Sequence, residues 1–204
     1  MSATENLWDK RYAQADYVFG VEPNAFLASQ SARLVPGARA LAVADGEGRN
    51  GVWLAQQGLS VLSIDNSAVA LAKARRLADE RGVTLAFEQV DLETWSWPEE
   101  AFDLVVAIFI QFAPPGLRDL IFAGLRRALK PGGLLLLEGY RPEQIAYGTG
   151  GPRVVENLYT EPMLRSAFAD LEILELRAYD APIHEGAGHD GMSALIDLVA
   201  RKPG

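Results

Sequence analysis

Five short apolar runs alternate with longer helix-like stretches through the middle of this 204-residue chain. The runs are almost continuously hydrophobic and bounded by turn residues, and they cover residues 40–44, 59–64, 85–90, 104–109 and 134–137. A strand that is buried on both faces needs apolar side chains at successive positions, whereas a half-exposed strand alternates. The pattern therefore predicts a mostly parallel sheet with helices on both faces, the doubly wound α/β class.

Two helices between these runs have clear end signals. Ser67 precedes the stretch AVALAKARRLADER as a typical N-cap residue, and Gly82 follows it where a glycine commonly ends a helix. A second helix is predicted to begin after the pair Pro114–Pro115 and to end at Lys130, just before Pro131. Strands and helices in this order are typical of repeated βαβ units.

The alternation of strands and helices stops in the last fifty residues. Two strand-like runs, 171–178 and 193–200, are joined by a polar loop without room for a helix, so we expect them to pair antiparallel. We predict one domain over the whole chain, divided into an N-terminal helical and aromatic cap (1–38), a cofactor-binding core (39–140), and a substrate loop with the antiparallel pair (141–204).

Charge and composition exclude several classes of function. The chain has 19 Lys plus Arg against 27 Asp plus Glu, a net charge of −8, and no cysteine. Nucleic acid is an unexpected partner because its phosphates are bound by clustered basic residues. The absence of cysteine excludes disulfides, thiolate metal sites and a cysteine nucleophile, and we expect no metal. No apolar run approaches the length of a membrane span, so the expected location is cytoplasmic. The sequence does not predict an oligomeric state.

The segment LAVADGEGRNGVWLAQQG, residues 41–58, carries a glycine-rich turn between a strand and a helix. Gly46, Gly48 and Gly51 spell GxGxxG, which lets the backbone approach a ligand near a helix N-terminus. Asp65 ends the next predicted strand, where a carboxylate can bind both hydroxyls of a ribose. Together these features favour an adenosine-type ligand.

Two cofactor classes fit this pattern. Asp91 follows the third predicted strand, where a carboxylate could accept a hydrogen bond from an adenine amino group. A dinucleotide also needs a pyrophosphate site, which the negative charge of Glu47 would oppose if that side chain pointed inward. S-adenosylmethionine has no phosphate and carries a positive sulfonium, so it is favoured. A nicotinamide-dependent oxidoreductase and a non-catalytic adenosine-ligand binding protein are the alternatives.

Several ordered motifs resemble one family. The stretches ADGEGRNGVWLAQQG, SIDNSAVALAKA, VDLETW, AFDLVVAIFIQF and LKPGGLLLLEGY are similar to those of class I S-adenosylmethionine-dependent methyltransferases, particularly the tellurite-resistance-type branch. The resemblance implies a Rossmann-like seven-stranded sheet in the order 3-2-1-4-5-7-6, with strand 7 antiparallel. It also implies S-adenosylmethionine as cofactor and methyl transfer to a small-molecule acceptor such as a thiol or a chalcogen oxyanion.

The resemblance also implies positions for the cofactor contacts. These are Gly46 and Gly48 beneath the cofactor, Asp65 and Asn66 at the ribose, Asp91 and Leu92 at the adenine, and Ile108 and Gln111 at the methionine end. The chain departs from the family pattern at Ala42, where an acid is usual, and at Ala44, where the first glycine is usual. We hypothesise that Asp45 compensates by facing the ammonium group of the cofactor.

The acceptor is expected at the carboxyl ends of the strands, where ligands bind in open α/β sheets. His184 and His189 are the only candidates for a base near neutral pH, and Gln111 is a further catalytic candidate. The candidate substrate residues are Tyr17, Tyr140, Arg141, Tyr147 and Arg153. Alternatively, the histidines are solvated loop residues and the glycine-rich stretch after Tyr140 is an ordinary surface loop. Methyl transfer can also proceed without a base, because the sulfonium is already activated.

Overall fold

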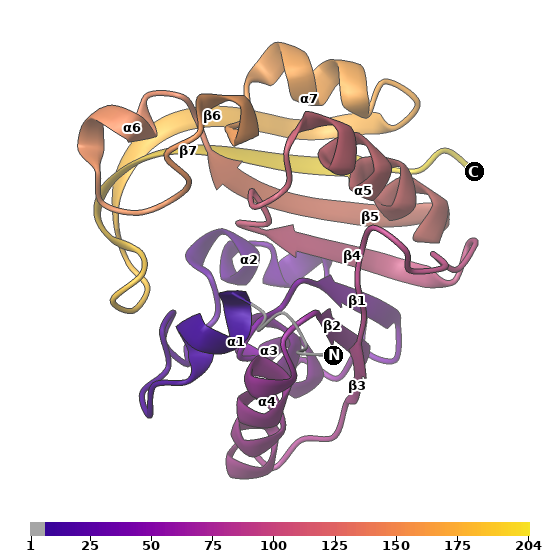
Figure 1. Cartoon of the computed structure of the whole chain (residues 1–204). Coiled ribbons are helices and arrows are strands. Elements are labelled where there is room, and N and C mark those ends of the chain that lie inside the picture. Colours follow the sequence, from indigo (N-terminus) through magenta and orange to yellow (C-terminus); the bar gives the residue numbers. More distant parts are fainter. Residues whose placement is uncertain (1–6) are drawn as a thin grey trace.

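The computed structural model describes residues 7–204 and contains one seven-stranded sheet in the order β3-β2-β1-β4-β5-β7-β6 (Figure 1). Its strands are β1 (Arg39–Val43), β2 (Ser60–Asp65), β3 (Ala86–Gln89), β4 (Phe102–Ile108), β5 (Leu129–Tyr140), β6 (Glu172–His184) and β7 (Asp190–Arg201). Neighbouring strands run parallel except β7, which is antiparallel to both β5 and β6. The predicted fold class, strand order and antiparallel strand are confirmed.

Helices cover both faces of the sheet. They are α1 (Leu7–Tyr12), α2 (Ala25–Ser29), α3 (Arg49–Gln56), α4 (Ala68–Glu80), α5 (Pro115–Ala128), α6 (Gln144–Tyr147) and α7 (Glu161–Ala167), with short 3-10 turns at Ser31–Arg33 and Val155–Asn157. Along β1, Leu41 and Val43 face the core beneath α5 and α7, while Ala40 and Ala42 face the core beneath α2 and α3. Burial on both faces explains why the strand is apolar at successive positions. Among the helices described, none has the length and apolar content needed to cross a bilayer.

The predicted helix ends are close to those observed. The Ser67 hydroxyl accepts a hydrogen bond from the backbone N–H of Ala70 at 3.0 Å, which caps α4, and Gly82 follows the helix with φ of 66°. Helix α5 ends at Ala128, two residues before the predicted end at Lys130. The reason is that Leu129 already pairs with β4 as the first residue of β5.

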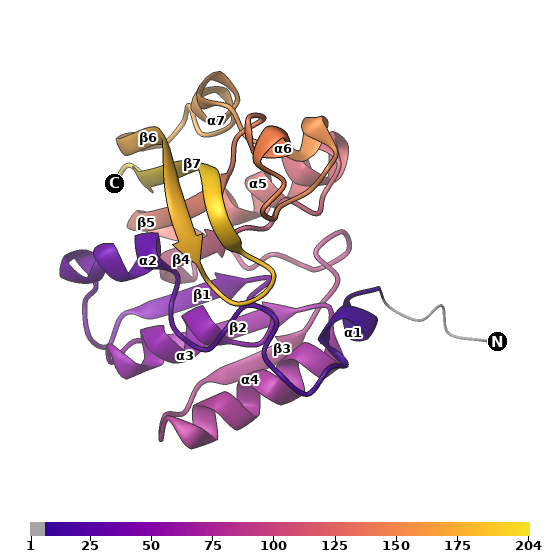
Figure 2. The same cartoon turned by 90° about the vertical axis from the view of Figure 1, so that its left-hand side faces the viewer.

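The C-terminal hairpin is longer than predicted. Residues 179–184 continue β6 and pair with residues 190–195 of β7, so the loop predicted between the two strands shrinks to a tip at residues 185–189. The long hairpin passes over the carboxyl edge of the sheet and meets the segment between α1 and α2 (Figure 2). There the backbone N–H of Gly188 donates to the Val18 carbonyl at 3.1 Å. The C-terminal hairpin and the N-terminal segment thus cover the same edge.

Helix α5 offers a matched pair of glycines for testing the packing of this core. A Cβ at Gly124 would lie 2.2 Å from the Trp97 ring, whereas a Cβ at Gly116 would meet nothing within 4 Å. We expect Gly124→Ala to lower the free energy of unfolding by about 1–3 kcal/mol, because the Trp97 ring must shift. Gly116→Ala should raise it by about 0.5 kcal/mol, because alanine restricts the unfolded chain. Urea denaturation of both variants measures the difference, and equal midpoints would contradict this packing.

Candidate functional site

A cavity of about 580 Å³ opens at the carboxyl edge of the sheet. Its wall combines the ends of β1, β2, β4 and β5 with the N-terminal segment and the tip of the C-terminal hairpin. The volume lies within the range that holds drug-sized ligands. The sequence-predicted positions on its wall are Asp45, Gly46, Asp65, Asn66, Asp91, Leu92, Ile108, Gln111, Tyr140 and His189.

Asp45 supports the glycine-rich turn from below. Its carboxylate accepts hydrogen bonds from the Gly51 backbone N–H at 3.1 Å and from the Ser63 hydroxyl at 2.8 Å. These bonds tie the first turn of α3 to β2. Burial raises the pKa of Asp45 to about 7, against the opposing effect of these hydrogen bonds. Both carboxylate oxygens therefore have partners within the protein, although the residue also lies on the cavity wall.

Asp65 joins the same turn to α4. One carboxylate oxygen accepts from the Gly46 backbone N–H at 2.8 Å, and the other accepts from the Ser67 backbone N–H at 2.8 Å. A carboxylate has about four lone-pair sites, so these two bonds leave capacity for a pair of ligand hydroxyls. Burial raises the pKa of Asp65 as well. This geometry fits a ribose at Asp65.

Gly48 lies against helix α4, whereas the resemblance implied that it would lie beneath the cofactor. It does not lie on the cavity wall, and a Cβ there would come within 2.6 Å of the Ala74 Cβ on α4. Its φ is 87°, which favours glycine. Gly48 therefore permits the close approach of the turn to α4 instead of a close approach of the cofactor.

Two strand ends on the cavity wall have strained backbones. Ala44 after β1 has φ of 49°, and Phe109 after β4 has φ of 55°. A left-handed conformation costs a residue other than glycine about 1 kcal/mol or more, and such residues concentrate at ligand sites. Ala44 stands where the resemblance expects a glycine, and it keeps the left-handed turn despite its Cβ.

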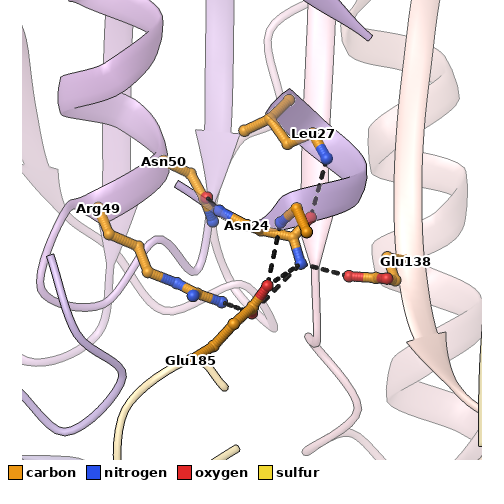
Figure 3. Close-up of polar contacts among 7 residues, drawn as sticks. Asn24, Leu27, Arg49, Asn50, Glu138 and Glu185 are labelled. Atoms are coloured by element: carbon orange, nitrogen blue, oxygen red, sulfur yellow. Dashed lines mark hydrogen bonds and ion pairs between the residues drawn. The ribbon is translucent and has the colours of Figure 1, made fainter. Parts of the chain in front are cut away.

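Glu185, at the hairpin tip, connects three segments around the cavity (Figure 3). Its carboxylate pairs with the Arg49 guanidinium at 2.7 Å and accepts hydrogen bonds from the Asn24 side chain at 3.1 Å and from the Ala25 backbone N–H at 3.0 Å. The Arg49 and Glu185 side chains are only 8% and 9% exposed. This buried ion pair fastens the hairpin to the first turns of α2 and α3.

Asn24 extends this network toward the sheet. Its backbone N–H donates to the Asn50 side chain at 2.9 Å, its side-chain oxygen caps α2, and its amide also donates to Glu138 on β5 (Figure 3). Burial and the neighbouring carboxylate of Asp197 raise the pKa of Glu138 well above its usual range. The network thus ends in a buried carboxyl group that is harder to ionise than an exposed one.

Aromatic rings surround His189 at the far end of the cavity. The ring centroids of Phe109, Phe19 and Tyr140 lie 4.4, 4.6 and 5.7 Å from that of His189. Burial, with smaller contributions from nearby arginines, lowers the pKa of His189 to about 3. The imidazole is therefore uncharged at neutral pH.

Gln111 is occupied by backbone hydrogen bonds. Its amide nitrogen donates to the carbonyls of Tyr140 at 2.9 Å and Asn157 at 3.2 Å, and its side-chain oxygen accepts from the Tyr140 N–H at 2.6 Å. These contacts hold the segment after β5 against the end of β4. The structure therefore gives Gln111 the geometry of a positioning residue.

Two other predicted residues lie outside the cavity. His184 is 76% exposed in its side chain and pairs with Asp190 at 2.6 Å across the hairpin, because β6 continues to this residue instead of ending before it. Tyr17 packs on α4, where its hydroxyl donates to the Lys73 carbonyl at 3.2 Å. Neither side chain lies on the cavity wall, so neither has the geometry expected of a catalytic or substrate-binding residue.

The remaining substrate candidates also point elsewhere. Arg141 and Tyr147 both contact the Asp180 carboxylate on β6, the tyrosine hydroxyl at 3.0 Å. Arg153 is exposed and lies outside the cavity wall. Tyr140, at the end of β5, reaches the cavity, and so do Gly151, Pro152 and Asn157 in the segment that follows. The two arginines expected to attract an anion therefore do not face the ligand space.

Sequence reasoning missed several wall residues, namely Arg11, Arg49 and Asn157. The aromatic N-terminal segment that contains Phe19 was a general signal for Arg11. Nothing local marks Asn157 or the pairing of Arg49 with the hairpin, because both depend on contacts between segments far apart in the chain.

Comparison with known proteins agrees with this geometry. Residues 40–133, which include the glycine-rich turn and both Asp65 and Asp91, match the model of a methyltransferase domain. Residues 40–133 thus carry a methyltransferase domain. Proteins with this domain use S-adenosylmethionine, in agreement with the resemblance seen in the sequence.

The methyltransferase domain has relatives of known name and structure. Over 128 residues it is 28% identical to a carboxy-S-adenosyl-L-methionine synthase of Geobacter metallireducens, covering 61% of this chain and 51% of that protein. TehB from Haemophilus influenzae superimposes with a TM-score of 0.72 at 17% identity, covering 96% of this chain and 65% of that one. A structure titled for the conversion of a disulfide bond into a thioacetal group in echinomycin biosynthesis superimposes with a TM-score of 0.77 at 21% identity, covering 96% and 90%. The chain spans about half the length of the curated relatives it matches.

The contribution of the buried ion pair between Arg49 and Glu185 can be tested by measuring the stability of the protein. Glu185→Ala leaves the Arg49 guanidinium buried without its carboxylate, so we expect the free energy of unfolding to fall by about 3–5 kcal/mol. Glu22 pairs with Arg81 at 2.6 Å but is 75% exposed in its side chain. Glu22→Ala should therefore change stability by about 0–1 kcal/mol. Denaturation of both variants checks this, and similar losses would show that the hairpin is not held by Glu185.

Asp45 should give a distinctive pH dependence. A carboxyl whose pKa is raised on folding contributes less stability as pH rises from its unfolded value of about 4 toward its folded value. Since Asp45→Asn cannot ionise, its stability relative to the parent protein should increase between pH 4 and pH 8, by up to about 4 kcal/mol.

Asp103 provides a control of opposite sign, because its hydrogen bond with Lys130 lowers its pKa. Asp103→Asn should therefore become less stable relative to the parent protein as pH rises from below the pKa of a free carboxyl. Thermal melts across the pH range measure both variants. The same slope for both would contradict the assignment for Asp45.

Proposed function

We propose that this protein transfers a methyl group from S-adenosylmethionine to a small-molecule acceptor. The observation that carries the proposal is the continuity of one cavity, which runs from Asp65 past the strained end of β4 at Phe109 to the rings around His189. A cofactor held at Asp65 and an acceptor held near His189 would share this space without an intervening wall.

The charges on the cavity wall support a cationic cofactor. Two arginines lie there, Arg11 and Arg49, against five acidic residues, Asp45, Glu47, Asp65, Asp91 and Glu93. Such a wall favours a positive sulfonium and disfavours a pyrophosphate. Glu47 alone does not decide this, because its carboxylate pairs with Lys73 at 2.7 Å and accepts from the Val18 N–H at 2.7 Å. The argument against a dinucleotide therefore rests on the other four acidic residues of the wall, Asp45, Asp65, Asp91 and Glu93.

Different residues of this chain would bind the cofactor, line the passage to the acceptor and bind the acceptor. S-adenosylmethionine, when bound, supplies an activated methyl group. Asp65 and the turn at Gly46 would hold the adenosine part, with Asp91 and Leu92 at the adenine and Asn66 beside the ribose. Ile108 and Phe109 line the passage to the acceptor and exclude water from it. His189 is the histidine placed to hydrogen-bond an acceptor, while His184 is directed to solvent.

Calorimetric titration tests this proposal. We expect S-adenosylmethionine and its demethylated product to bind and NAD not to bind. Asp65→Asn should weaken binding of both by at least about tenfold, or about 1.4 kcal/mol, because the amide offers fewer acceptor sites to the ribose. Asp103→Asn, at the opposite end of β4, is the matched control and should bind normally. Binding of NAD in preference to both, or no effect of Asp65→Asn, would contradict the proposal.

A further inference from the structure

The acceptor end of the cavity is an aromatic chamber, formed by the rings of Phe19, Phe109, Tyr140 and His189. These residues come from the N-terminal segment, the end of β4, the end of β5 and the hairpin tip. The Phe109 and Tyr140 rings stack on each other with centroids 4.6 Å apart. Flat aromatic walls of this kind fit a flat or apolar ligand body.

The chamber lacks a buried positive charge that is free to meet an anion. His189 is uncharged because burial lowers its pKa. Arg49, the buried arginine on the described part of the wall, is already paired with Glu185. Arg11 is exposed, and its guanidinium stacks over the rings of Trp8 and Phe19 at the rim. An oxyanion in the chamber would lose its hydration without gaining a buried cation, which is costly.

Three residues of the cavity wall have a buried polar atom without a hydrogen-bond partner. Within residues 7–204, these atoms are Nδ1 of His189, the side-chain oxygen of Asn157 and the hydroxyl of Tyr140. His189 and Asn157 are 7% and 8% exposed. A buried polar group without a partner is destabilising, so such groups in a cavity indicate where a ligand's polar atoms bind.

We infer that the chamber selects an uncharged acceptor with a flat, ring-bearing body and a hydroxyl or thiol group, and that it rejects oxyanions. His189 and Asn157 would hydrogen-bond the polar group while the rings hold the body. In the transfer, the acceptor's oxygen or sulfur forms a bond to the methyl carbon as the bond from that carbon to the cofactor sulfur breaks. The electron pair of the broken bond stays on that sulfur, and the acceptor's proton is released to water. This inference rests on the proposed function and narrows its substrate class.

The chamber can be tested by binding, with the demethylated cofactor present. The probes are 4-methylphenol, which is uncharged at pH 7.5 as tyrosine is, and 4-methylbenzoate, which has the same ring but a negative charge. Selenite serves as an inorganic oxyanion. We expect 4-methylphenol to bind at least about tenfold more tightly than 4-methylbenzoate, and selenite not to bind measurably.

Two variants locate the binding. Asn157→Asp places a negative charge in the chamber at unchanged size, and His189→Phe keeps the ring but removes the hydrogen-bonding nitrogen. Each should weaken binding of 4-methylphenol at least about fivefold, without changing the affinity for the demethylated cofactor. Val155→Asp, in the same turn as Asn157 but 47% exposed, adds the same charge outside the cavity wall and should have no effect. Melting curves confirm that each variant is folded.

The outcomes separate this inference from the proposed function. Tighter binding of 4-methylbenzoate or selenite, or no binding of 4-methylphenol to protein that binds the demethylated cofactor, overturns the inference and leaves the proposed function standing. If the demethylated cofactor itself does not bind, the proposed function fails. The same titrations without cofactor then still decide whether the chamber prefers the uncharged probe.

Discussion

Buried carboxylates organise the carboxyl edge of this sheet. Where parallel strands end, backbone N–H groups of the following turns and helices need acceptors that no further strand provides. Asp45 accepts from α3, Asp65 accepts from the turn and from α4, and Glu185 accepts from α2. Each carboxylate thereby joins two or three segments that are distant in the sequence. The ligand cavity is the space left between these joined segments.

The same carboxylates give the cavity its electrostatic character. Their hydrogen bonds oppose the effect of burial on the pKa, which nevertheless remains raised at Asp45 and Asp65. A cationic ligand would offset the cost of keeping these acids ionised away from water. Under the proposed function, structure and selectivity for a positive cofactor would come from the same groups, and a change at one of them should affect folding and binding together.

The cofactor half of this arrangement is predictable from sequence because it is local. The glycine-rich turn, Asp65 and the Ser67 cap each lie within a few residues of a strand end, and the strand pattern places those ends at one edge. Gly48 shows the limit of such reasoning. Its motif position suggests a cofactor contact, but its close neighbour is Ala74, twenty-six residues further along the chain.

The acceptor half was less predictable because it depends on the pairing of β6 with β7. Extending that hairpin to residue 184 turns His184 out to solvent and brings His189 to the cavity, although the two lie in one short stretch. Arg141 was expected to attract an anion, yet the same strand pairing places Asp180 beside it. The side chains that would recognise an acceptor thus belong to the hairpin tip and the N-terminal segment, which cover the sheet edge without forming part of its core. Under the proposed function, substitutions in these two segments other than at Glu185 would alter the acceptor, while Asp45 and Asp65 beneath them preserve the cofactor site and the fold.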